Sequence, residues 1–212
     1  MAITQHPMQA LAAYLPERCF EPVVQYIHHY KVQLTVTRKR KTVLGDYRND
    51  HTGANHRISI NGNLNKYEFL ITLLHELAHL LTFEQYKNRV EPHGKEWKNC
   101  YSKLLIDFVQ KGVFPPDIEQ ALEKSIINPA ATANGETALM KVLKLYNTQS
   151  REGYVIVEQL PDGAFFQTEN GRIFQKVGRR RKRYECVEVA TGRRYAFSPL
   201  SDVQPIAENE KA

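Results

Sequence analysis

The hydrophobic residues between positions 69 and 83 recur at the intervals of a helix and do not alternate as in a strand. Leucines at positions 70, 73, 74, 77 and 81 form one apolar group with this spacing. Asn65, followed by Glu68 three residues later, has the pattern of a helix N-cap with a capping box. We therefore predict a strongly apolar helix that begins just after Asn65.

A second helical stripe follows and ends near Gly112, because glycine commonly terminates helices. This stripe places Trp97 and Tyr101 in a hydrophobic core rather than in a substrate pocket. Shorter helices are predicted in residues 3–15, 22–30, 117–127 and 136–146.

Apolar and polar residues alternate over residues 32–37, which predicts a half-buried strand. Residues 38–41 would form its turn and residues 42–48 a returning strand. A third strand is predicted at residues 57–60, just before the apolar helix. We expect Arg57–Asn61 to form a sheet edge that can hold an extended peptide by backbone hydrogen bonds.

From Tyr154 onward the pattern changes to short strands separated by turns that contain glycine. A small antiparallel barrel or meander is the simplest arrangement, because strands this short must close or pack to be stable. The preceding residues 128–135 are small and turn-prone, as in a linker. The predicted strands cover residues 154–159, 164–168, 172–177, 184–189 and 193–197.

The 212 residues suffice for one domain of ordinary size and a small second one. A hydrophobic content of 42% and a charged content of 25% are typical of a soluble globular protein. The N-terminal residues do not resemble a signal peptide and no apolar run could span a bilayer, so neither export nor membrane insertion is indicated. Three widely spaced cysteines without a Cys-x-x-Cys pair argue against a disulfide framework and favour a cytoplasmic location.

The net charge of +6 is concentrated near the C-terminus. Residues 171–194 contain nine lysines and arginines against two glutamates, a net charge of +7, which leaves −1 for the rest of the chain. A solvated hairpin tip would explain this basic segment, but its interleaved aromatic residues favour contact with nucleic-acid phosphates. We expect little sequence specificity, because no base-reading motif is visible. The central cations are Arg179, Arg180, Arg181, Lys182 and Arg183.

The apolar helix carries the pattern His-Glu-x-x-His at His75, Glu76 and His79. Side chains four residues apart lie on one helical face, with Cβ atoms roughly 5 to 6 Å apart, so both imidazoles can reach one tetrahedral zinc. Glu76 is rotated by about 100° from His75 and is better placed to contact a water at the metal than the metal itself. One turn of helix therefore offers two ligands and a general base.

A hydrolytic zinc site requires a third protein ligand and a position left open for water. His93 fits this role if the second helix packs back on the first, and Gly94 would permit close approach of the backbone there. Other histidines lack a helical or motif context, and nearby carboxylates are typical of a helix start. The alternatives to His93 are therefore His51, His56, Glu91 and Glu96.

The motif from His75 to His79, followed after thirteen residues by His93 and then by Trp97, resembles the SprT-like family of zinc metallopeptidases. That family includes the Spartan DNA–protein crosslink proteases. The resemblance covers about residues 35–108. It implies that the three histidines bind zinc and that Glu76 is the catalytic base. Many members also carry a C-terminal zinc ribbon with four cysteines, whereas this region of the chain has only Cys186, so we expect no second, structural zinc.

Together these patterns predict an α+β protein with a zincin-like metallopeptidase core and a small C-terminal antiparallel β module. We expect a SprT-like domain at residues 1–127, a linker and helix at 128–150, a small basic β domain at 151–206 and a tail at 207–212. The expected function is a zinc-dependent endopeptidase that acts on DNA-associated or DNA-crosslinked proteins, as in DNA–protein crosslink repair. Two alternatives stay open: a non-catalytic nucleic-acid-binding protein with a structural zinc, and a peptidase acting on ordinary proteins.

Overall fold

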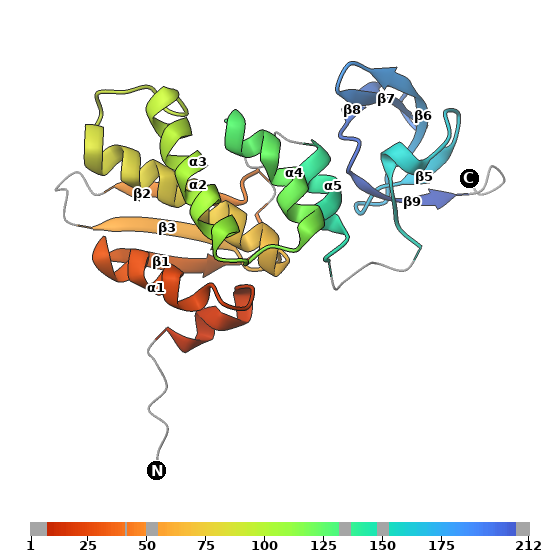
Figure 1. Cartoon of the computed structure of the whole chain (residues 1–212). Helices are drawn as coiled ribbons and strands as arrows, with labels where there is room; N and C mark the ends of the chain where they lie inside the picture. Colours follow the sequence, from red (N-terminus) through yellow and green to blue (C-terminus); the bar gives the residue numbers. More distant parts are fainter. Residues whose placement is uncertain (1–7, 41, 50–54, 132–136, 148–152, 207–212) are drawn as a thin grey trace, which may run out of the picture. The chain divides into compact units, whose positions relative to one another are not determined.

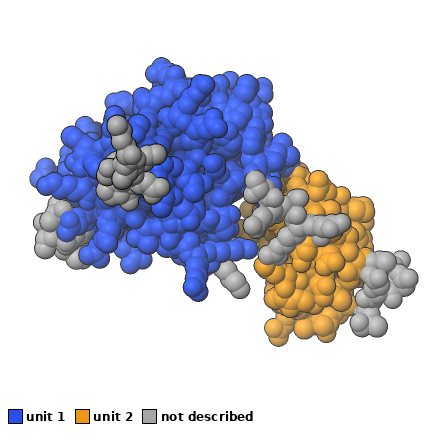
Figure 2. Space-filling model, turned by 90° about the horizontal axis from the view of Figure 1, so that it is seen from below, with its two compact units in different colours: residues 1–147 blue, residues 148–212 orange. Residues whose placement is uncertain are grey.

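The computed structural model describes residues 8–40, 42–49, 55–131, 137–147 and 153–206. The fold is α+β, with helices and two sheets (Figure 1). The chain forms two compact units, residues 1–147 and residues 148–212, which Figure 2 distinguishes by colour. Within the described ranges, no helix combines the length and apolar character needed to cross a membrane.

The first unit combines a three-stranded sheet with the helices that precede and follow it in the chain (Figure 1). The short 3₁₀ helix η1 covers the later part of the helix predicted in residues 3–15, whereas residues 1–7 lie outside the description. The elements in chain order are η1 (Gln9–Tyr14), α1 (Phe20–His29), β1 (Val32–Thr37), β2 (Gly45–Asn49), β3 (His56–Asn61), α2 (Lys66–Tyr86), α3 (Lys95–Gln110), α4 (Pro116–Ile127) and α5 (Thr137–Lys144).

The sheet order is β1-β3-β2, with β3 parallel to β1 and antiparallel to β2. The predicted hairpin between the first two strands is therefore wrong. Arg40, in the segment between β1 and β2, contacts β3 instead of a turn: its guanidinium donates to Asn61 Oδ1 at 2.8 Å and to Ser59 Oγ at 3.0 Å. The edge predicted at Arg57–Asn61 is also wrong. β3 contains the fully buried Ile60, and it lies in the middle, so the outer strands are β1 and β2.

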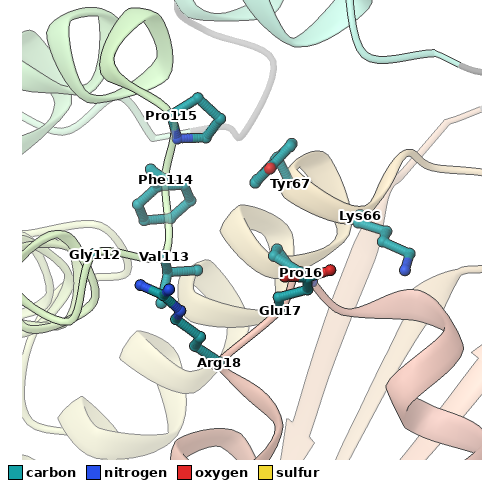
Figure 3. A pocket seen from close by; sticks show the side chains of 9 residues that line it. All are labelled: Pro16, Glu17, Arg18, Lys66, Tyr67, Gly112, Val113, Phe114 and Pro115. Atoms are coloured by element: carbon teal, nitrogen blue, oxygen red, sulfur yellow. The ribbon is translucent and has the colours of Figure 1, made fainter.

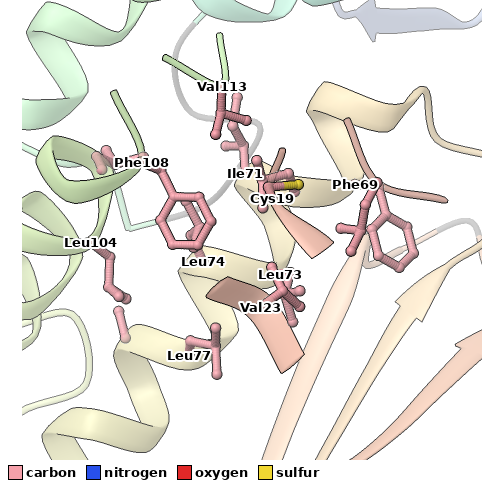
Figure 4. Packing of buried hydrophobic residues seen from close by; sticks show 14 of the residues in the cluster. Cys19, Val23, Phe69, Ile71, Leu73, Leu74, Leu77, Leu104, Phe108 and Val113 are labelled. Atoms are coloured by element: carbon pink, nitrogen blue, oxygen red, sulfur yellow. The ribbon is translucent and has the colours of Figure 1, made fainter. Parts of the chain in front are cut away.

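Helix α2 is buried on almost every side, which explains its unusually apolar sequence. Every residue from Phe69 to Ala78 is buried. Figure 4 shows the α2 leucines packed between Val23 of α1 and the α3 side chains Leu104 and Phe108. Burial of one leucine contributes about 1.5–3 kcal/mol, so this helix anchors the core of the first unit.

The start of α2 is fixed by Asn65, as predicted. The Asn65 side chain accepts hydrogen bonds from the main-chain N–H groups of Tyr67 and Glu68, at 3.1 and 3.0 Å. Its amide nitrogen also donates to the Leu143 carbonyl at 2.8 Å. Leu139 and Leu143 of α5 join the first core, so the expected segment 128–150 is divided and its helix packs within the first unit.

The second unit is an antiparallel six-stranded sheet with the order β4-β9-β5-β6-β7-β8. Its small core includes Phe166, Phe174 and Cys186. Strand β9, which pairs with β4 and β5, is absent from the prediction because Pro205 interrupts its pattern. The elements are β4 (Val155–Ile156), η2 (Val157–Gln159), β5 (Phe165–Gln167), β6 (Ile173–Arg180), β7 (Arg183–Glu188), β8 (Arg194–Phe197) and β9 (Asp202–Ile206).

Candidate metal centre

His75, Glu76 and His79 project from the middle of α2, where the helix is surrounded by core side chains. His75 and Glu76 are buried, at 5% and 7% exposure, whereas His79 is partly exposed. The helical spacing brings the two imidazole rings to a centroid separation of 5.1 Å. The centre therefore has a buried carboxyl group and one side that opens toward solvent.

His93 reaches the same place from the turn that begins α3. Its backbone has a φ of 59°, a left-handed conformation that is uncommon for residues other than glycine. Gly94, the N-cap residue of α3, follows, and a Cβ there would lie 2.9 Å from the Glu91 carbonyl oxygen. Only glycine fits without movement of the backbone, as the sequence pattern suggests. The tight turn directs the His93 ring toward the histidines of α2.

The three imidazoles converge on one point. Each offers one nitrogen, and the three nitrogens lie within 4.8 Å of one another. The ring centroid of His93 lies 4.5 Å from that of His79 and 5.4 Å from that of His75. These residues could together hold a metal ion. Among the described residues, His56, Glu91 and Glu96 do not belong to this group, and His51 lies outside the description.

The buried Trp97 forms one wall of the centre. Its ring lies 4.6 Å from the ring of His93, 4.8 Å from that of His75 and 5.3 Å from that of His79. Among the described residues, the buried atoms His75 Nδ1 and His93 Nε2 have no hydrogen-bond partner. An unpartnered buried polar atom costs about 1–3 kcal/mol, so the described arrangement is incomplete without a group that binds these nitrogens. A metal ion that accepts imidazole ligands fits this donor set.

The environment keeps the three histidines neutral at pH 7. Burial, with repulsion from the other two imidazoles, lowers the pKa of His75 to about 3. Burial and repulsion from His93 lower the pKa of His79 to about 4, and burial also lowers the pKa of His93. Because only the neutral imidazole ligates metals, the site is ready to bind a cation without first losing protons.

Glu76 is surrounded by groups that hold its carboxylate in place. Burial, reinforced by the negative charge of Asp46, raises its pKa to about 8, while Arg40 and the main-chain N–H of Tyr47 act in the opposite direction. With a pKa of about 8 this group is mainly protonated at pH 7 in the metal-free protein, and a bound cation would favour the carboxylate that can accept a proton. Its hydrogen bond from Tyr47 connects the helix to strand β2.

Two residues of β2 contribute to the site although the sequence pattern alone does not single them out. Gly45 packs so closely on α2 that a Cβ would lie 2.6 Å from Glu76 Oε1 and 2.7 Å from Thr72 Cγ2. Tyr47 lies beside His79, with parallel rings 6.4 Å apart. A lone glycine inside a strand pattern is the available signal, because it often marks close approach of a backbone.

Two depressions on the first unit differ in their relation to the centre. One, of about 390 Å³, is lined by the segment from Pro16 to Arg18 and by Tyr67 and Phe114 (Figure 3), and none of the three histidines lines it. The other, of about 330 Å³, is lined by His93 together with Lys95. Only the second adjoins the candidate metal centre.

We predict that Gly45→Ala destabilises the first unit by about 1–3 kcal/mol, because the added methyl group overpacks the contact with Glu76 and Thr72. Denaturant unfolding followed by fluorescence of Trp97, the single tryptophan, measures this change. The matched control is Gly178→Ala in the second unit, where the nearest atom to the added Cβ lies 3.7 Å away. An unchanged unfolding midpoint for Gly45→Ala would contradict the close approach of β2 to α2.

Comparison of the sequence with known proteins agrees with the resemblance indicated by the His-Glu-x-x-His motif. Residues 9–111 match the model of the SprT-like family. Within the chain, 31 residues are 55% identical to part of Protein SprT from Glaesserella parasuis serovar 5 (strain SH0165), a match covering 15% of this chain and 19% of that protein. No solved structure matches the chain significantly. The region of residues 9–111, which includes the three histidines and Glu76, thus matches the SprT-like family.

Proposed function

We propose that the first unit is a zinc-dependent endopeptidase with a zincin-like core, and that its substrates are proteins bound or crosslinked to DNA. The observation that carries this proposal is the convergence of three neutral imidazoles beside a buried carboxylate, Glu76. The match to the SprT-like family supports the same chemistry.

The donor set favours zinc at an open site. Imidazole nitrogens bind zinc at about 2.0–2.1 Å, and nitrogens on one tetrahedral ion lie roughly 3.3 Å apart. The three nitrogens lie within 4.8 Å of one another, so modest ring rotations suffice. Structural zinc sites normally have four protein ligands, whereas three histidines form this group among the described residues. A position is therefore left for water or substrate, which favours a catalytic role over a purely structural one.

Zinc, when bound, polarises the scissile carbonyl and lowers the pKa of water. The protein contributes the proton transfers. Glu76 takes a proton from the attacking water and delivers it to the leaving amine. Its hydrogen bond from the Tyr47 N–H and its contact with Gly45 keep the carboxylate in one orientation during both transfers.

The structure also offers places for a peptide substrate. Strand β2 is an outer strand of the sheet and packs on α2 beside the centre, so an extended peptide would pair with β2 rather than with β3. The depression lined by His93 and Lys95 provides room for a neighbouring substrate side chain.

The second unit supplies the proposed nucleic-acid contact through the hairpin of β6 and β7. Arg180 pairs with Arg183 across the hairpin, and Arg181 and Lys182 form its exposed turn. Other cations of the basic segment serve the fold. Lys176 is buried and donates to the Leu160 carbonyl at 2.5 Å, whereas Arg172 pairs with Glu188 at 2.6 Å. The cations available to phosphates are therefore mainly those of Arg179–Arg183.

The first test concerns the metal. We expect the purified protein to bind one zinc ion and His93→Ala to bind it more than about 100-fold more weakly, since loss of a ligand exceeds the 10- to 100-fold effect of an outer-shell partner. Chelator competition followed by elemental analysis measures both. The carboxylate variants Glu91→Ala and Glu96→Ala should bind like wild type. Equal zinc affinity for His93→Ala would remove His93 from the ligand set.

The second test concerns catalysis. Glu76→Gln should retain zinc while peptide cleavage falls by roughly 10²- to 10⁴-fold, because the amide cannot accept the proton. The assay incubates enzyme, DNA and a loosely folded DNA-binding protein, with and without chelator, and detects fragments on gels. DNA binding by wild type without any cleavage would favour the non-catalytic alternative. Cleavage that is insensitive to added DNA would favour a peptidase of ordinary proteins.

The third test concerns the hairpin. If five phosphates are neutralised, the logarithm of the DNA-binding constant should fall with the logarithm of salt concentration with a slope of about −4.5. Replacing both Arg181 and Lys182 by glutamine should reduce the slope by roughly 1.8, because each lost phosphate contact contributes about 0.9. The control replaces two exposed lysines of the first unit, Lys103 and Lys124, and leaves the slope unchanged. Equal slopes for the two double variants would contradict the assignment of the hairpin.

A further inference from the structure

Tyr47 of β2 lies between two histidines with different surroundings. On one side its ring is parallel to that of His79, with an interplanar angle of 2° and a centroid separation of 6.4 Å. On the other side it stacks against His56, at 25° and 5.9 Å. His79 belongs to the candidate metal centre, whereas His56 lies on β3 outside it.

The hydroxyl group of Tyr47 contacts the buried His56, which in turn pairs with the exposed Glu84. It lies 2.9 Å from His56 Nδ1, and His56 Nε2 lies 3.3 Å from Glu84 Oε1 on α2. Because Nε2 faces a carboxylate, the arrangement places the ring proton there and leaves Nδ1 to accept from the hydroxyl group. The edge of His56 also contacts Phe83, at a centroid separation of 6.0 Å. Rotation of Tyr47 would therefore break this partly buried hydrogen bond and leave Nδ1 of the buried His56 without it.

The main chain of Tyr47 also contacts Glu76 of α2. The Tyr47 N–H donates to the Glu76 carboxylate, and Gly45 lies against that carboxylate on the same face of β2. Residues two apart on a strand share a face. One short segment of β2 thus contacts both the proposed base and one proposed ligand.

We propose that Tyr47 is a positioning residue that fixes the ring plane of His79, and that the His56–Glu84 pair fixes Tyr47 in turn. This inference rests on the proposed metal centre and deepens it. The terminal torsion of a histidine side chain has a broad preference, so packing must select the ring orientation that directs a nitrogen at the metal. Trp97 also packs near His79, at 5.3 Å and 33°, so two aromatic rings restrict the rotation of the imidazole.

The experiment compares the full-length variants Tyr47→Ala, Tyr47→Phe and Glu84→Gln with wild type. The readouts are zinc affinity by chelator competition and the visible absorption spectrum of the Co²⁺-loaded protein, which reports ligand geometry. Tyr47→Ala should weaken zinc binding about 10- to 100-fold and change the Co²⁺ spectrum. Tyr47→Phe and Glu84→Gln should change the spectrum in the same direction with a smaller loss of affinity. The matched control, Tyr146→Phe, removes a hydroxyl hydrogen bond to Asp117 of 2.7 Å in the same unit and should behave like wild type.

The outcomes separate this inference from the proposed function. If wild type binds zinc and all three variants keep its affinity and Co²⁺ spectrum, the role of Tyr47 is overturned while the metal centre stands. If wild type binds no zinc, the proposed centre fails and this inference fails with it. Should Tyr47→Ala fail to fold, as judged by Trp97 fluorescence, the spectra of Tyr47→Phe and Glu84→Gln decide, and unchanged spectra in both overturn the proposal.

Discussion

The first unit depends on one constraint. Helix α2 is buried on nearly all sides, yet it must also carry two imidazoles and a carboxyl group within the core of the unit. Apolar packing of α2 provides the stability, since Phe69–Ala78 are all buried. The polar groups at His75 and Glu76 oppose it, because polar atoms removed from water need partners. The surrounding elements supply those partners or leave room for them. A turn brings in His93, β2 brings a main-chain N–H, and the three imidazoles together form a group that fits a metal ion.

The same constraint explains why β2 approaches the helix so closely. A side chain at Gly45 would displace Glu76, and a shorter residue at Tyr47 would remove the parallel ring that lies beside His79. The two outer strands therefore have different roles. β1 packs against α1, whereas β2 contacts the groups proposed to carry out the reaction. The second unit has its own core and presents cations on a hairpin, so catalysis and nucleic-acid contact are assigned to separate units in the proposed function.

Much of this could be predicted from the sequence, because local rules act within a single element. Helical periodicity located α2 and α3, the side chain of Asn65 marked the start of α2, and the His-Glu-x-x-His spacing grouped His75, Glu76 and His79. Strand pairing could not be predicted in this way. The order β1-β3-β2 brings together residues about 20 positions apart, as in the contacts of Arg40 with Asn61 and Ser59, and no periodicity records such contacts. For the same reason the sequence pattern does not indicate the contacts of Tyr47 with His79 and Glu76, because these depend on the packing of β2 beside α2. Strand β9 was not predicted because it contains Pro205, and a proline usually argues against a strand.

The cap at Asn65 also bears on how far the folded unit extends along the chain. Its amide group donates to the Leu143 carbonyl and to Asn147 Oδ1, both at 2.8 Å, so the first turn of α2 is tied to residues about 80 positions downstream. The match to the SprT-like family ends at residue 111, well before these acceptors. A truncated fragment ending there would retain all three histidines yet lose the tether at the start of the helix that bears two of them. The hydrogen bonds that hold the start of this helix therefore involve residues as far along the chain as Asn147.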